Sequence, residues 1–201
     1  MPSLVILTVG LAGCFASNLA KFEQDLASRS DAVSSYEELV FFELELDKSK
    51  KLQIASPLTV IQTEFGDAFV LPISVPAGAK SFYIRSILST DIASTSHVVY
   101  PTVFFSDSDL SELDRIEPKM EAVYAGFVDS MYFEQTIDLP VRTSKVVAVF
   151  SPKHFGQYLV YDATMHYGAM VGAVPVTGSK KGDYDIPIGP GGPFRIEFQR
   201  D

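Results

Sequence analysis

The stretch Phe194-Arg195-Ile196-Glu197-Phe198-Gln199 places apolar and polar residues in strict alternation. Successive side chains of a β-strand point to opposite faces, so this period of two predicts a strand with one buried and one exposed face. Lys80 to Leu88 alternates in the same way, with Phe82 and Ile84 on one face and Tyr83 on the other. Both segments therefore predict strands of a sheet that covers a hydrophobic core.

Further strand-forming segments are spread along the chain. Val146 to Phe150 is continuously apolar, which predicts a central strand buried on both faces. Pro72 interrupts another run and favours an edge strand or a bulge there, because proline cannot donate to a ladder. The remaining runs rich in β-branched and aromatic residues are Leu39 to Leu46, Phe69 to Val75, Val98 to Phe105 and Val123 to Leu139.

Other segments favour helices, turns or loops. Asp162 to Val171 predicts a short helix with Asp162 as its N-cap, and Asp109 to Arg115 predicts one helical turn. Residues 173–193 hold four prolines and five glycines, which predicts an irregular loop. Within it, Gly189 to Pro193 predicts a rigid turn. We expect a mainly β fold, an antiparallel, jelly-roll-like β-sandwich over residues 37–201 with one or two short helices.

Length and composition suit one globular domain. The chain has 201 residues, of which 47% are hydrophobic and 20% charged. Its formal net charge is −9, which disfavours binding to a nucleic-acid backbone. No uncharged apolar run reaches the length of about 18 residues that a membrane-spanning helix needs.

The first residues predict export and lipid attachment. Residues 1–13 contain a short apolar core, and Leu11-Ala12-Gly13-Cys14 follows the pattern of a lipobox. We therefore predict a lipoprotein signal peptide over 1–13, lipid attachment at Cys14, and a lipid-anchored linker or short helix over 14–36. The alternative is a buried first strand with an inert cysteine, which the absence of Lys or Arg from Met1-Pro2-Ser3 favours.

The same features predict where the protein resides. A lipid on Cys14 would anchor the chain to the membrane on its periplasmic side. Phe15 stands where an aspartate would indicate retention in the inner membrane, so we expect the outer membrane.

The sequence contains no recognisable catalytic motif. It lacks HExxH, GxSxG and SxxK patterns, and its three histidines, His97, His154 and His166, show no metal-ligand spacing. We expect no enzyme activity, no metal and no cofactor. A hydrolase with an unmarked triad is the alternative, since triads are defined by geometry. The acidic run Asp107 to Asp114 favours a solvated loop over a calcium site.

Tyrosines are the best candidates for ligand contacts. Sugar faces stack on aromatic rings that are flanked by polar groups, although packing in the core explains a tyrosine equally well. The candidate ligand-binding residues are Tyr83, Tyr158, Tyr161, Tyr167 and Tyr184.

Several segments between residues 65 and 199 carry a resemblance in their order. They are Ile73 to Ser86, Val99 to Phe105, Val146 to Phe150, Asp162 to Gly172 and Asp185-Ile186-Pro187. Together they resemble the maltose operon periplasmic protein (MalM) family. The resemblance implies an exported protein that accompanies maltose and maltodextrin uptake, and it assigns no catalytic residues. The lipobox, and the lack of a long polar, Ala/Pro-rich C-terminal extension, depart from that pattern.

Two functional hypotheses follow. The first is a non-enzymatic accessory of carbohydrate transport that binds a glucan or an outer-membrane partner. The second is a structural or assembly lipoprotein that binds another envelope protein through a sheet edge or residues 173–193.

Overall fold

The computed structural model describes Gln24, Leu26, Ser28, Arg29 and residues 32–55, 58–89, 97–123, 132–171 and 174–200, without the side chains of 161–171 and 174–184. Cys14 and the proposed signal peptide lie outside these residues. Leu26 lies within the linker or short helix expected over 14–36. It is helical and buried.

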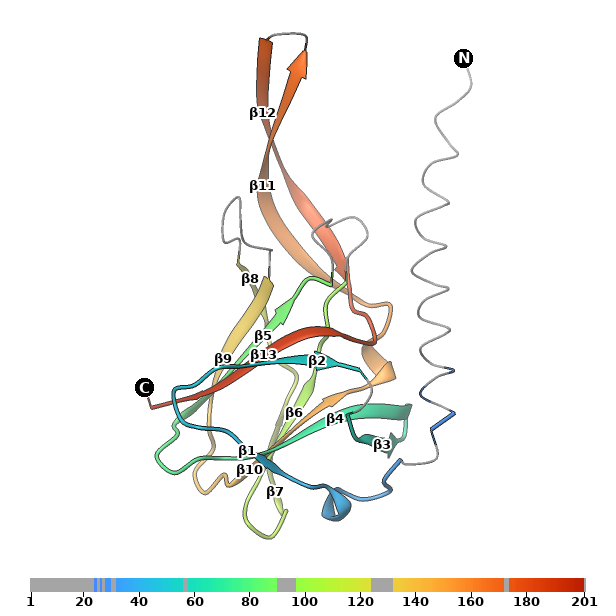
Figure 1. The fold of residues 1–201 in the computed structure, drawn as a ribbon, viewed down its shortest axis with the longest axis vertical. Helices are drawn as coiled ribbons and strands as arrows, with labels where there is room; N and C mark the ends of the chain where they lie inside the picture. Colours follow the sequence, from blue (N-terminus) through green and yellow to red (C-terminus); the bar gives the residue numbers. More distant parts are fainter. Residues whose placement is uncertain are drawn as a thin grey trace.

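A six-stranded sheet forms one layer of the molecule (Figure 1). Its main path runs β1-β4-β10-β6-β7, and β3 pairs with β4 off this path. β1 is parallel to β4, while the other pairs in this sheet are antiparallel. The strands are β1 (Phe42–Glu43), β3 (Val60–Thr63), β4 (Gly66–Ser74), β6 (Thr102–Ser106), β7 (Glu112–Ile116) and β10 (Lys145–Phe150).

A five-stranded antiparallel sheet forms the second layer. Its order is β2-β13-β5-β9-β8, so a strand near the end of the sequence occupies the interior of the sheet. The strands are β2 (Lys50–Ile54), β5 (Ser81–Ile87), β8 (Glu121–Val123), β9 (Tyr132–Asp138) and β13 (Gly192–Gln199).

The two sheets pack face to face around one principal core. Phe150 of β10 meets Phe194 of β13 edge to face, with ring centroids 5.2 Å apart. Phe82 of β5 contacts Phe198 of β13, with centroids 5.0 Å apart. Such aromatic pairs add to the gain from apolar burial. The chain therefore forms the β-sandwich that its alternating segments predict.

The most regular predicted strands are confirmed. β13 alternates buried and partly exposed residues along its whole length. β5 does the same from Phe82 to Ile87. In β10, all residues from Val146 to Phe150 are buried, as expected for a strand between two neighbours.

Pro72 lies inside β4 and not on an edge strand or a bulge. It stands opposite Val147 of β10. Val70, two residues earlier, donates its N–H to Thr59 O on the other side of β4. Because successive residues alternate in direction, the nitrogen of Pro72 faces the same side, between the ends of β3 and β1. No ladder bond is lost there, which explains why an interior strand tolerates this proline.

The helix expected over Asp162 to Val171 and the irregular loop expected over 173–193 are both wrong. Tyr158–Val171 forms β11 and Val174–Pro187 forms β12, and the two strands pair antiparallel along their full length. β12 and β13 together take up most of residues 173–193. An isolated N-cap signal at Asp162 is worth little against fourteen residues of cross-strand pairing, because local propensity yields to such contacts.

Smaller differences concern the acidic run and the first β segment. The turn expected over Asp109 to Arg115 gives way to β7, and Asp107 Oδ1 caps the preceding loop by accepting from the N–H groups of Asp109 and Ser111, both at 3.0 Å. Within Leu39 to Leu46 only β1 is a strand. The short helices are the 3-10 turns η1 (Tyr36–Glu38) and η3 (Pro152–His154).

Phe194 provides a test of the sandwich core. Its side chain is fully buried against Phe150, so Phe194→Ala should lower the free energy of unfolding by about 3–5 kcal/mol. Urea unfolding measures this loss. Val141, which is 88% exposed in a turn, is the control, and Val141→Ala should change stability by less than about 0.5 kcal/mol. Similar losses for both variants would contradict the assigned core.

Candidate functional site

The most distinctive feature of the structure is the arm, which we define as β11 and β12. Each strand has 14 residues, and the pair extends away from the sandwich (Figure 1). At the usual rise per residue, such a hairpin is about 45 Å long. Within the described part of the chain, β11 and β12 pair only with each other. Both outer edges of the arm therefore leave backbone N–H and C=O groups without a strand partner.

The arm is joined to the sandwich by packing at its root. Leu159 of β11 and Ile186 of β12 belong to a cluster with Val98 and Phe133 at one end of the sandwich. Beyond β12, Ile188 donates its N–H to Gln157 O at 2.7 Å and accepts from Gly156 N at 3.0 Å. These two bonds join the ends of the hairpin to each other, and Val98 ties them to the body by donating to Pro187 O at 3.1 Å and accepting from Gly189 N at 2.8 Å.

A close contact between His97 and Gly189 reinforces the same region. The ring nitrogen Nε2 of His97 lies 2.6 Å from Gly191 O, and Nδ1 lies 3.0 Å from Ser89 Oγ. A Cβ atom at Gly189 would stand 2.1 Å from the ring, a distance that no side chain accepts without movement. Glycine is therefore required at position 189, in the turn that leads from the arm into β13.

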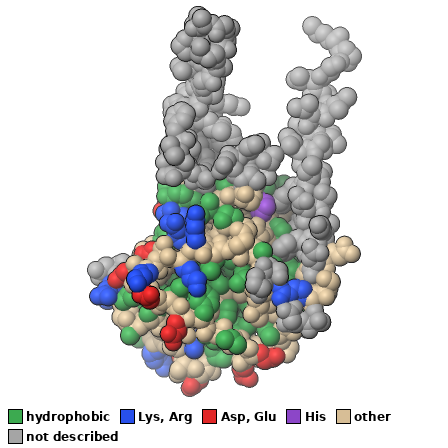
Figure 2. Space-filling view, viewed as in Figure 1, with side chains coloured by type: hydrophobic (Ala, Val, Ile, Leu, Met, Phe, Trp, Pro, Cys, Tyr) green, Lys and Arg blue, Asp and Glu red, His purple; other side chains and the backbone are tan. Residues whose placement is uncertain are grey.

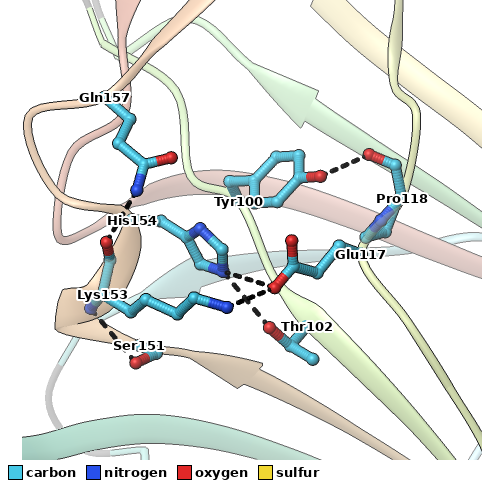
Figure 3. A network of polar contacts seen from close by, with 8 residues as sticks. All are labelled: Tyr100, Thr102, Glu117, Pro118, Ser151, Lys153, His154 and Gln157. Atoms are coloured by element: carbon cyan, nitrogen blue, oxygen red, sulfur yellow. Dashed lines mark hydrogen bonds and ion pairs between the residues drawn. The ribbon is translucent and has the colours of Figure 1, made fainter. Parts of the chain in front are cut away.

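A polar network surrounds His154 on the other side of the root (Figure 3). His154 ends η3, between β10 and the arm, and is almost fully buried. Its Nε2 lies 3.3 Å from Thr102 Oγ1 and 3.9 Å from Glu117 Oε1. Lys153 Nζ donates to the same Glu117 oxygen at 2.6 Å. Tyr100 packs its ring edge to face on His154, with centroids 5.0 Å apart.

Burial controls the protonation of these groups. Desolvation lowers the pKa of His154 below its ordinary value, and the opposing attraction of Glu117 is smaller. The hydrogen bond from Lys153 lowers the pKa of the Glu117 carboxyl. Burial also lowers the pKa of His97. Near neutral pH, His154 is accordingly an uncharged ring that packs the root of the arm.

The arrangement around His154 does not form a nucleophile–base–acid relay. A catalytic triad uses both ring nitrogens, one toward the nucleophile and one toward the carboxylate. Here Thr102 and Glu117 approach the same nitrogen, Nε2, and His154 is 2% exposed. Within the described ranges, no group of three or more His, Cys, Asp or Glu residues is placed to hold a metal ion.

The candidate tyrosines fall into two places. Tyr158, Tyr161, Tyr167 and Tyr184 all belong to the arm, and Tyr161 and Tyr184 are cross-strand partners. Tyr158 is 60% exposed at the root. The structure does not describe the side chains of Tyr161, Tyr167 and Tyr184. The sequence pattern gave no sign that these four residues share one hairpin, because Tyr167 lay in the expected helix and Tyr184 in the expected loop.

Tyr83 lies on the five-stranded sheet, apart from the arm. Its hydroxyl donates to Glu134 Oε2 and accepts from Arg85 Nε at 2.6 Å. Burial and the bond to Glu134 raise the pKa of Tyr83 above its ordinary value. Tyr83 is thus already engaged by protein groups. Alternation along β5 already places Arg85 on the same face as Tyr83, but sequence reasoning missed Glu134, which only strand register brings to it.

No described helix is long and apolar enough to cross a membrane. Comparison of the chain with models of known protein families, with curated protein sequences and with solved structures finds no match.

The buried His154 predicts a pH dependence of stability. Its pKa is lowered in the folded protein, so the unfolded chain binds more protons below the ordinary value of about 6.5, and stability falls as the pH drops from about 7 to 5. In His154→Gln this loss should shrink by at most about 1.4 kcal/mol per pH unit. Urea unfolding at several pH values measures it. His97→Gln isolates the share of the second, partly buried histidine, and an unchanged profile in His154→Gln contradicts the assignment.

Proposed function

We propose that this chain is an exported, lipid-anchored, non-enzymatic accessory protein of carbohydrate (maltose or maltodextrin) transport that binds an outer-membrane partner protein through the arm. The arm is the observation that carries the proposal. The lipobox at Cys14 and the resemblance described above support the location and the transport context. A structural or assembly role on another envelope protein is the alternative, and it would use the same surface.

The physical argument for a protein partner rests on the edges and the root. A lone two-stranded hairpin is marginally stable in water, and its open edges accept another strand by backbone hydrogen bonds. The root, by contrast, packs into the sandwich through Leu159, Ile186 and Ile188, and Val98 hydrogen-bonds the residues that end and follow β12. A hairpin that is fixed at one end and unpaired along its length is suited to reach a partner and add to its sheet.

Binding of a glucan to the arm is a second candidate. It is favoured by the position of four candidate tyrosines on one hairpin, with Tyr161 opposite Tyr184. Aromatic rings that are spaced along a strand pair suit the successive units of a linear saccharide. The glucan candidate and the protein-partner candidate predict different binding results for the same variants, so one set of proteins tests both.

The central test shortens the arm and keeps its root. Residues 162–183 are replaced by Asn-Gly, which forms a tight hairpin turn between the paired residues Tyr161 and Tyr184. The full-length chain, extracted in detergent, should co-purify an outer-membrane protein that binds it again when both are purified. The shortened variant should not bind. Val141→Ser, on an exposed turn outside the arm, is the matched control and should bind normally.

Titration calorimetry with a series of maltodextrins completes this test. Saturable heat that grows with saccharide length and disappears in the shortened variant would support the glucan candidate in place of the protein partner. Binding of the same purified partner by the shortened variant would overturn the role of the arm. Equal unfolding midpoints for the sandwich in all variants would show that the comparison concerns binding and not folding.

The anchor has a separate test. Intact mass spectrometry of the protein extracted from membranes should show loss of residues 1–13 and added acyl mass on Cys14. The variant Cys14→Ser should lack the acyl mass and leave the membrane fraction, because acyl chains supply roughly 0.8 kcal/mol of membrane binding per buried methylene. A soluble wild-type product that retains Met1 contradicts the anchor.

A further inference from the structure

The outer face of the five-stranded sheet carries a charged row that spans all five strands. Each residue in it stands directly opposite the next in the strand register. In the order β2, β13, β5, β9, β8, the row reads Lys51, Arg195, Arg85, Glu134, Glu121. Three cations are therefore adjacent, and two anions follow at one end. Lys and Arg side chains lie close together on the face of the sandwich in Figure 2.

The anionic end of the row is satisfied within the protein. Arg85 Nη2 lies 3.0 Å from Glu134 Oε2, and Arg85 Nε lies 2.6 Å from Tyr83 Oη. The guanidinium also stacks over the ring of Tyr132, at 3.8 Å from the centroid. These contacts hold Arg85 in one position. Its Nη1 group takes no part in them and remains available to a ligand.

The cationic end of the row is not satisfied. The side chain of Arg195 makes no hydrogen bond or ion pair with the described residues, and its Nε atom is buried without an acceptor. Glu197, the next residue on that face of β13, accepts from Gln199 Nε2 at 3.3 Å. Like charges directly opposite each other destabilise a sheet, and an unpartnered buried donor adds a further cost. An anion bound beside Arg195 would offset its repulsion with Lys51 and Arg85.

We propose that Arg195, Arg85 and Lys51 form a binding site for a phosphate group. The guanidinium group of Arg195 offers a planar fork that matches the oxygens of a phosphate, Arg85 adds its Nη1 group, and the ammonium group of Lys51 adds a third positive charge. The carboxylates of Glu134 and Glu121 repel such a group, so its position is over Arg195, toward β2. The phosphate can belong to a sugar phosphate or to a lipid headgroup. The site is separate from the arm and does not rest on the proposed function.

Titration of the full-length Cys14→Ser chain, which carries no acyl chains that would insert into vesicles, with inorganic phosphate, glucose 6-phosphate and neutral glucose tests the site. Vesicles of phosphatidylcholine alone or mixed with phosphatidylglycerol are the second arm. We expect saturable binding of at least one phosphate-bearing probe and none of glucose or pure phosphatidylcholine. Arg195→Gln should weaken that binding by 10-fold or more, corresponding to about 1.4 kcal/mol. Binding to mixed vesicles alone assigns a lipid headgroup. Binding of glucose 6-phosphate assigns a sugar phosphate.

Arg142→Gln is the matched control, because it removes the same charge from the turn between β9 and β10. It should leave the affinity within about twofold. Arg195→Lys keeps the charge but loses the planar fork, so an intermediate affinity is expected. Phosphate should raise the melting temperature of the wild type and not that of Arg195→Gln. Absence of binding to every phosphate-bearing probe, or equal weakening by Arg142→Gln, would overturn the site.

Discussion

Phe150 of β10 meets Phe194 of β13 where the interior strands of the two sheets face each other. This contact joins a six-stranded and a five-stranded sheet that share no strand pairing with each other. The apolar faces of β4, β5, β10 and β13 supply most of the surrounding core. Because the inner faces of the two sheets pack against each other, the outer face of the five-stranded sheet and the arm are left for contacts with other molecules.

The two features that we connect with binding depend on this core in different ways. The arm leaves the sandwich at a smaller cluster around Val98 and Ile186, where His154 is buried and His97 is partly buried. The charged row needs no cluster of its own, since strand register alone aligns Lys51, Arg195 and Arg85. One surface is thus a long projection with open backbone edges, and the other is a flat face with charged side chains.

Hydrophobic periodicity predicted the strands in which burial determines where the apolar residues lie. β5 and β13 alternate and β10 is continuously apolar, so these three strands of the sandwich could be predicted from their sequences. The arm was not predictable in this way, because β11 and β12 extend away from the sandwich (Figure 1) and glycine and proline interrupt β12. The row around Arg195 was also hidden, since its residues come from strands far apart in the sequence.

The place of β13 has a consequence for how the molecule acquires its fold. Gly192–Gln199 pairs with β2 on one side and β5 on the other, at separations of more than a hundred residues. A chain that has been synthesised only as far as the arm lacks this strand, and its core aromatics remain exposed. High contact order of this kind slows folding and leaves the nascent chain unfolded for longer. Under the export that we propose, this delay would favour translocation before folding.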